Sequence, residues 1–152
     1  MILKPKWHSL FMHIASAYAQ MSLDPSTQVG CVIAQGKFQV SQGFNGLPAG
    51  ILDTEERLNN RNEKLNLVLH AEENALFYAR KEDLKGATIY VTAPPCSRCA
   101  TKIIQVGIKE VFYEVASEDF MRRYKENIEL TMEIFNEAGI LVNEVDYVSE
   151  TN

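Results

Sequence analysis

The sequence predicts an α/β fold, in which helices cover both faces of one mixed sheet of about five strands as a three-layer α/β/α arrangement. Three observations lead to this prediction. The chain opens with apolar residues at helical spacing, continues with a hairpin-like pair of short β-type runs, and from residue 71 onwards alternates regularly between helix-type and strand-type segments. The resulting order α-β-β-α-β-α-β-α-β requires both parallel and antiparallel neighbours in the sheet.

The first element is an amphipathic helix of about five turns. Asp24 and Pro25 end it, because the residue before a proline disfavours helical geometry. Its predicted core face consists of aromatic and aliphatic residues three or four positions apart: Trp7, Phe11, Ile14, Tyr18 and Met21.

The next segments are predicted as a hairpin followed by irregular chain. Strands over residues 29–34 and 38–44 flank the turn Gln35-Gly36-Lys37. Residues 45–50 hold too many turn-forming residues for regular structure. The charged, Asn-rich stretch 54–65 reads as a surface helix or loop.

The second half is predicted to alternate strictly. A glycine closes two of its helices, as expected for a residue just past a helix end. The expected elements are a helix over 71–80, a strand over 87–92, a helix over 97–106, a strand over 110–115, a long helix over 118–138 with Phe120, Tyr124, Ile128, Thr131 and Phe135 on one face, and a strand over 140–148.

Length and charge restrict the class of protein. We expect a single domain spanning residues 1–152. There is no apolar run of about 18 residues to cross a membrane, and residues 1–7 lack a signal-peptide pattern, so the expected compartment is the cytoplasm. The net charge of −5 disfavours nucleic acid as a partner, since such proteins usually present a basic face.

Three residues form a candidate metal site: His70, Cys96 and Cys99. Catalytic zinc sites use three imidazole, thiolate or carboxylate ligands and leave one position open. Both motifs open predicted helices, whose N-termini favour thiolate, and the spacing of the cysteines places them on one helix face. The third cysteine, Cys31, lies in an apolar run and is expected to be a small buried side chain.

Glu72 is the candidate proton-transfer residue, because its offset of two residues from His70 places its carboxylate near the open coordination position. A bound zinc lowers the pKa of water towards neutrality, and a carboxylate there can take up a proton and return it to a leaving group. We predict that Glu73 points to another face. The remaining histidines, His8 and His13, have no cluster of ligand-type residues around them.

Other interpretations of these residues remain open at this stage. Cys-x-x-Cys also occurs in redox pairs and structural zinc sites. A redox pair does not call for His-Ala-Glu upstream, and a structural site needs a fourth ligand unless Cys31 supplies it. A zinc-stabilised binding module without catalysis is therefore the alternative from another class.

Zinc deaminases carry His-x-Glu followed by Pro-Cys-x-x-Cys, and this chain contains that signature from His70 to Cys99. Over most of its length it resembles the deoxycytidylate (dCMP) deaminases, a branch of the zinc-dependent cytidine/deoxycytidylate deaminase family. The signature alone is shared with cytidine, cytosine, guanine and tRNA adenosine deaminases, whereas the loop Gly-Phe-Asn-Gly-x-Pro-x-Gly resembles the deoxycytidylate branch. The matching segments are residues 24–30, 43–50, 70–75, 90–92, 95–100 and 107–111.

The resemblance implies a cytidine-deaminase-like fold and hydrolysis of dCMP to dUMP and ammonia, supplying dUMP for thymidylate synthesis. Glu72 would protonate N3 of the ring and then the departing amine. Ala71 and the segment from Thr92 to Pro94 would hold the base edge. Asn45 would contact the sugar, and the turn formed by Ser26, Thr27 and Gln28 would approach the 5′-phosphate.

The resemblance also implies regulation and assembly. Such enzymes are often hexamers activated by dCTP and inhibited by dTTP, and the loop containing Gly46, Pro48 and Gly50 would lie near the effector. Mg²⁺ would accompany a nucleoside triphosphate. Glycines let the backbone approach phosphates closely. A deaminase of a free nucleoside, a base or a tRNA adenosine is the alternative with the same chemistry.

The chain departs from the family pattern in two respects. Many members carry extra Cys and His ligands for a second, structural zinc, and this sequence has none to spare, so we expect one Zn²⁺ per subunit. Members usually also have a tyrosine near the substrate phosphate shortly after the strand that ends here near Val115. This sequence has Glu118 at that register, with Phe120 nearby.

Overall fold

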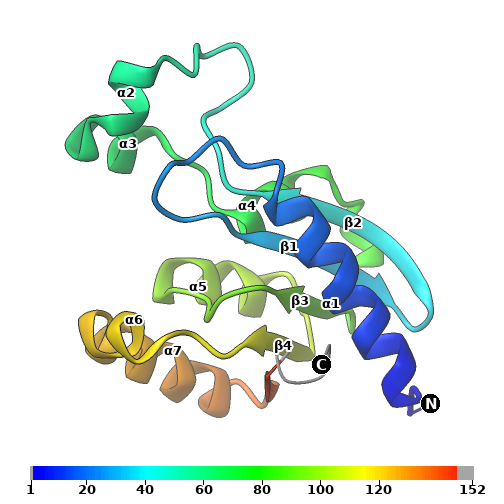
Figure 1. The fold of residues 1–152 in the computed structure, drawn as a ribbon. Helices are drawn as coiled ribbons and strands as arrows, with labels where there is room; N and C mark the ends of the chain where they lie inside the picture. Colours follow the sequence, from blue (N-terminus) through cyan, green and yellow to red (C-terminus); the bar gives the residue numbers. More distant parts are fainter. Residues whose placement is uncertain (1, 147–152) are drawn as a thin grey trace.

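The computed structural model describes residues 2–146 and confirms the predicted α/β class (Figure 1). The helices are α1 (Pro5–Ala19), α2 (Glu55–Asn59), α3 (Arg61–Leu67), α4 (Ala71–Tyr78), α5 (Ser97–Gln105), α6 (Glu118–Arg123) and α7 (Lys125–Glu137), with a 3₁₀ turn at Lys81–Asp83. The strands are β1 (Gly30–Gln35), β2 (Phe38–Phe44), β3 (Thr88–Val91), β4 (Glu110–Glu114) and β5 (Leu141–Val145).

The five strands form one mixed sheet in the order β2-β1-β3-β4-β5. Strand β1 pairs antiparallel with both β2 and β3, whereas β3, β4 and β5 run parallel. The parallel pairs are joined by crossovers that contain helices, as a short connection cannot reverse the chain twice. The sheet therefore combines a hairpin half with a helix-connected half.

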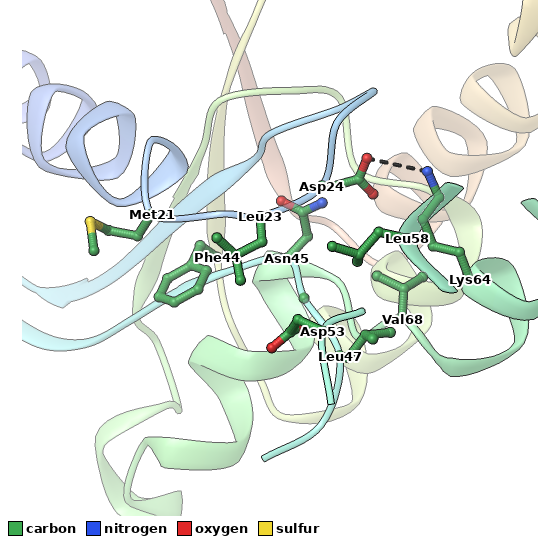
Figure 2. Close-up of a pocket in the computed structure, with 11 residues that line it drawn as sticks. Met21, Leu23, Asp24, Phe44, Asn45, Leu47, Asp53, Leu58, Lys64 and Val68 are labelled. Carbon is green, nitrogen blue, oxygen red and sulfur yellow. Dashed lines mark hydrogen bonds and ion pairs between the residues drawn. The ribbon is translucent and has the colours of Figure 1, made fainter. Parts of the chain in front are cut away.

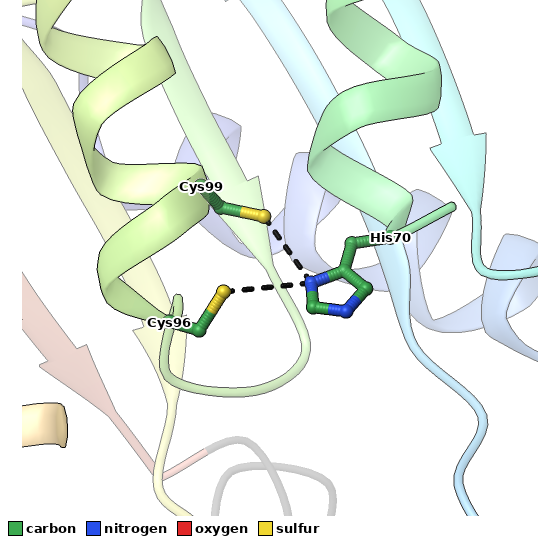
Figure 3. A group of neighbouring side chains, drawn as sticks. All are labelled: His70, Cys96 and Cys99. Atoms are coloured by element: carbon green, nitrogen blue, oxygen red, sulfur yellow. Dashed lines mark hydrogen bonds between the residues drawn. The ribbon is translucent and has the colours of Figure 1, made fainter. Parts of the chain in front are cut away.

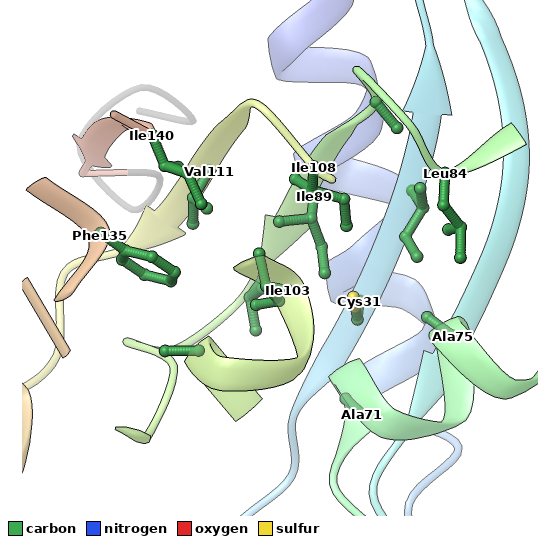
Figure 4. Packing of buried hydrophobic residues seen from close by; sticks show 14 residues of the cluster. Cys31, Ala71, Ala75, Leu84, Ile89, Ile103, Ile108, Val111, Phe135 and Ile140 are labelled. Carbon is green, nitrogen blue, oxygen red and sulfur yellow. The ribbon is translucent and has the colours of Figure 1, made fainter. Parts of the chain in front are cut away.

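Two apolar clusters bury the two faces of the sheet. On one face, Phe11 and Met12 of α1 pack against Val32, Tyr90 and Phe112. On the other, α4, α5 and α7 cover a larger cluster, shown in Figure 4, that includes Cys31, Ile89, Ile103, Val111 and Phe135. Helices on both faces confirm the predicted three-layer arrangement, and the buried Cys31 confirms its expected place in the core.

The long helix predicted over 118–138 is wrong in one respect, because the structure divides it at Tyr124. This residue has φ −112° and ψ 18°, outside helical geometry, and separates α6 from α7. Only the last three residues of the predicted face are buried: Ile128, Thr131 and Phe135. Phe120 and Tyr124 instead contact each other, with ring centroids 4.6 Å apart, so their helical spacing reflects a local aromatic pair.

Smaller differences affect other elements. Helix α1 ends at Ala19, so Met21 is 61% exposed and is not part of the core face. Residues 54–65 fall in two short helices, begun by the caps Thr54 and Asn60, whose side chains accept backbone N–H groups. The final strand ends at Val145, and residues 147 and 148 of its predicted range lie outside the described residues. No helix in the described part of the chain could cross a membrane.

Candidate metal and catalytic site

Two helix N-termini on the same face of the sheet carry the candidate site. His70 is the N-cap residue of α4, and Cys96 is the N-cap residue of α5. Helix α4 lies close to β2, where an added Cβ on Gly43 would come within 2.5 Å of the Ala71 carbonyl oxygen. Only glycine permits this approach, and it fixes the position at which α4 begins.

The three predicted ligands converge, as Figure 3 shows. The Nδ1 atom of His70 lies 3.5 Å from Cys96 Sγ and 3.3 Å from Cys99 Sγ, and all three ligand atoms lie within 4.8 Å of one another. A tetrahedral zinc ion with ordinary bond lengths separates its sulfur and nitrogen ligands by about 3.6 Å. The donor set therefore fits one zinc ion, which His70 would bind through Nδ1.

The pKa values of the two cysteine thiols are shifted in opposite directions. A hydrogen bond from the Cys99 thiol, with a second contribution from His70, lowers the pKa of Cys96 to about 4 despite its partial burial. The same hydrogen bond and burial raise the pKa of Cys99. Hydrogen bonding to Cys96 also raises the pKa of His70. One thiolate is thus already favoured, and thiolate is the form that binds metal.

Glu72 lies beside the ligands and is buried, at 4% exposure. Burial raises the pKa of its carboxyl group to about 7, although a hydrogen bond from its own backbone N–H and the charge of His70 act in the opposite direction. A group that titrates near neutrality suits general acid–base work, because it can both accept and return a proton.

Glu73 has a structural role in the first turn of α4. One carboxylate oxygen accepts a hydrogen bond from the His70 backbone N–H at 3.0 Å, and the other forms an ion pair with Lys102 at 3.2 Å. These partners lower the pKa of Glu73 although partial burial opposes them. The interaction closes the first turn of α4 like the acidic half of a capping box. The spacing from His70 to Glu73 carries that signal, but the sequence interpretation missed it.

The predicted phosphate contacts lie in the segment before β1, and the predicted sugar contact, Asn45, follows β2 and contacts that segment. Ser26, Thr27 and Gln28 are exposed there. Asn45 is buried and holds this segment in place. Its Oδ1 accepts from Val29 N and its Nδ2 donates to Thr27 O, both at 2.8 Å. The sequence does not indicate this anchoring role, because the residues that Asn45 bonds lie 16 and 18 positions earlier in the chain and no short motif links them.

The residues predicted to hold the base edge lie in the first turn of α4 and in the segment that joins β3 to α5. Ala71 is buried in the first turn of α4, and Pro94 is buried just before Cys96. The Thr92 hydroxyl accepts a hydrogen bond from Gly30 N at 3.0 Å, while Thr92 N donates to Gly30 O at 3.1 Å. Thr92 therefore joins the end of β3 to the start of β1.

One pocket, shown in Figure 2, is lined by Gly46 but not by the other two predicted effector residues, Pro48 and Gly50. Gly46 also pairs with Leu69, directly before His70, through two backbone hydrogen bonds of 2.8 and 3.0 Å. Pro48 accepts the N–H of Ile51 in a turn, and Gly50 has a φ of +89°. The pocket has a volume of about 340 Å³ and contains the ion pair of Asp24 with Lys64.

Comparison with known proteins identifies the family. The model of the cytidine and deoxycytidylate deaminase zinc-binding region matches residues 5–115. The chain belongs to this family. The match includes all three predicted ligands and Glu72, and a zinc-binding site at His70, Cys96 and Cys99 agrees with it.

Deoxycytidylate deaminases are among the relatives of this chain. The chain is 44% identical over 137 residues to an uncharacterised deaminase of Aliivibrio fischeri, and the match covers 90% of this chain and 92% of that one. It is 37% identical over 145 residues to human deoxycytidylate deaminase, covering 89% and 77%. The crystal structure of dCMP deaminase from cyanophage S-TIM5 with dCMP and dUMP matches 95% of this chain and all of that one, with a TM-score of 0.76 and 26% identity.

Proposed function

We propose that this deaminase hydrolyses dCMP to dUMP and ammonia and so supplies dUMP for thymidylate synthesis. The observation that carries the proposal is the convergence of His70 Nδ1 and the two cysteine sulfurs beside the buried carboxyl group of Glu72. Named deoxycytidylate deaminases among its relatives, and a related phage enzyme that binds dCMP and dUMP, support this substrate.

The site residues divide the work between binding and proton transfer. A zinc ion held by His70, Cys96 and Cys99 supplies the activation of water. Glu72 takes one proton from the attacking water and delivers it to N3 of the cytosine ring while the water oxygen bonds to C4. It then takes the second proton from the new C4 hydroxyl group and gives it to the amine, so that the C4–N bond breaks and ammonia leaves. Burial around Glu72 excludes bulk water, which would otherwise compete for the proton.

The surrounding residues bind the substrate. Ala71, Thr92 and Pro94 hold the base edge from the ends of α4 and β3, and Asn45 faces the sugar. Ser26, Thr27 and Gln28 approach the phosphate. Asp24 Oδ1 supports their turn by accepting the N–H groups of Ser26 and Thr27, at 2.8 and 3.1 Å.

The pocket beside Asn45 and Gly46 supports regulation by nucleotides. We assign it to dCTP as activator and dTTP as inhibitor, with Mg²⁺ bound to the triphosphate and Pro48 and Gly50 shaping the adjoining loop. Lys64 supplies a cation at the pocket wall, and its ion pair with Asp24 connects the pocket to the turn of Ser26.

We also propose that the protein is cytoplasmic and assembles as a homo-oligomer, namely a hexamer. Two neighbouring aromatic residues of α4, Phe77 and Tyr78, are 63% and 76% exposed. Aromatic side chains are enriched at surfaces that contact another protein. Light scattering of the purified protein measures the assembly directly.

Ammonia release tests the activity. The zinc-loaded protein is incubated with dCMP, deoxycytidine, cytidine or guanine, and dCMP is expected to react with the highest kcat/KM. The dCMP reaction is repeated with dCTP and Mg²⁺, and with dTTP. Equal turnover of deoxycytidine and dCMP would contradict the assignment to the monophosphate, and no response to either triphosphate would contradict the regulatory part alone.

A further inference from the structure

We propose that Asn127, on α7, is a positioning residue for the zinc ligand Cys96. Its carboxamide forms two hydrogen bonds with Ser97, the residue directly after this ligand. The Oδ1 atom accepts from Ser97 N at 3.0 Å, and Nδ2 donates to Ser97 Oγ at 2.9 Å. The two residues are 30 positions apart, so the contact joins separate elements.

The first of these bonds gives a partner to the first backbone N–H of α5, that of Ser97. The first backbone N–H groups of a helix have no partner within it, and an N-cap side chain usually satisfies one of them. In α5 the N-cap residue is Cys96, whose side chain forms no such bond. Asn127 supplies an acceptor for Ser97 N from a neighbouring helix, and the adjacent Cys96 sulfur lies 3.5 Å from His70 Nδ1.

Cys96 needs this support more than Cys99 does. The Cys99 side chain is fully buried and is held by the packing of α5 against the sheet, whereas Cys96 is only partly buried. The residue before Cys96, Pro95, is fully buried and fixes the backbone on that side. The residue after it, Ser97, is held by its two hydrogen bonds with Asn127.

Helix α7 can hold the carboxamide rigidly because the same helix is anchored in the core. Thr131 and Phe135 are completely buried and Ile128 nearly so, while Asn127 is exposed at the start of the helix. A polar group held by a packed helix loses little conformational freedom when it forms a hydrogen bond. Asn127 thus connects the core of the protein to a metal ligand.

Zinc affinity tests this inference, which rests on the proposed metal site and not on the identity of the substrate. Zinc is titrated from the folded protein with a chromophoric chelator, and Asn127→Ala is expected to weaken binding about tenfold, as for other residues that orient metal ligands. The Co²⁺-substituted protein gives a second measurement, since the sulfur-to-cobalt and d–d absorption bands report the geometry of the ligands. We expect these bands to shift or broaden in Asn127→Ala.

Two variants distinguish positioning from general stabilisation. Asn127→Asp can form both bonds, because one carboxylate oxygen accepts from Ser97 N and the other from the Ser97 hydroxyl, so it should restore wild-type cobalt bands. Asn66→Ala is the matched control: Asn66 is an exposed helical asparagine whose Nδ2 donates only to Asn62 O in α3. It should leave zinc affinity unchanged.

Several results would overturn the inference. If Asn127→Ala kept the zinc affinity and cobalt bands of the wild type, the inference would be wrong, even if the metal-free protein melted at a lower temperature. It would also be wrong if Asn66→Ala lost as much zinc affinity as Asn127→Ala, or if Asn127→Asp did not restore the wild-type cobalt bands. A wild-type protein that bound no zinc would overturn the metal site itself and the proposed function with it. Normal zinc binding without dCMP turnover would overturn only the proposed function.

Discussion

At the scale of single residues, Glu72 and Glu73 have the same side chain in different surroundings. Consecutive helical positions point about 100° apart, so one carboxyl group enters the buried space beside the ligands and the other reaches Lys102. The pKa of Glu72 rises to about 7 through burial, while bonds to His70 N and Lys102 lower that of Glu73. Their positions in the first turn of α4 therefore make Glu72, and not Glu73, the carboxyl group suited to proton transfer.

Replacing Glu72 with glutamine tests this difference. Because the amide cannot accept and return a proton, Glu72→Gln is expected to reduce kcat for dCMP by about 10²–10⁴-fold, the usual contribution of a general acid–base group. Zinc content, measured by elemental analysis, should stay near one ion per chain. Glu73→Gln is the control, since its amide oxygen can still accept from His70 N, and it should lose far less. Full activity in Glu72→Gln would contradict the proton-transfer role.

A second residue-scale prediction concerns Thr131, whose hydroxyl is buried without a hydrogen-bond partner among the described residues. An unsatisfied buried polar group costs free energy, and an apolar replacement of the same shape removes that cost. Thr131→Val should therefore stabilise the protein by about 1 kcal/mol, or roughly 2–4 °C in melting temperature. Calorimetry measures this. The exposed Thr101→Val is the control, and a lower melting temperature for Thr131→Val alone would contradict the prediction.

At the scale of elements, much of the fold follows from sequence patterns. The five strands and helices α1, α4 and α5 were predictable because apolar periodicity and glycine positions mark them directly. Tyr124 was not, since the periodicity continues across it and only backbone geometry reveals the break. The metal ligands were predictable because the two short motifs that contain them, residues 70–72 and 95–99, have ligand-type side chains at a known spacing, although 26 positions separate His70 from Cys96. Asn45, Lys64 and Asn127 act on residues at least 16 positions away, and no short pattern indicates such contacts.

The contact between β2 and α4 gives a prediction at this scale. An added Cβ on Gly43 would meet the Ala71 oxygen at 2.5 Å and the Ala75 nitrogen at 2.7 Å. Both are backbone atoms and cannot rotate away, so Gly43→Ala should displace α4, which carries Glu72. We expect a loss of about 1–3 kcal/mol in unfolding free energy, measured by urea denaturation, together with weaker zinc binding.

Gly46→Ala is the matched control for stability, because its added Cβ has no neighbour within 4 Å and its φ is not positive. It should unfold at nearly the wild-type urea concentration. If Gly43→Ala were as stable as Gly46→Ala and bound zinc equally well, the close approach of β2 would not determine the position of α4.

At the scale of the whole molecule, the sheet separates two apolar clusters that do not depend on the metal ligands for their packing. Helix α1 covers one face with Phe11 and Met12, and α5 and α7 cover the other with Ile103 and Phe135. The site lies at the ends of α4 and α5, on the side of the second cluster. The fold should therefore persist when the ligands have no metal to hold.

Zinc removal tests this independence of fold and metal. After chelation, dCMP turnover should be lost while the far-UV circular dichroism spectrum stays close to that of the zinc-loaded protein. The melting temperature should fall, since a ligand that binds only the folded state adds RT ln(1 + [L]/Kd) to its stability. Added Zn²⁺ should restore both activity and melting temperature. Cooperative unfolding on chelation would instead indicate a structural zinc, because folding and metal binding are then a single process.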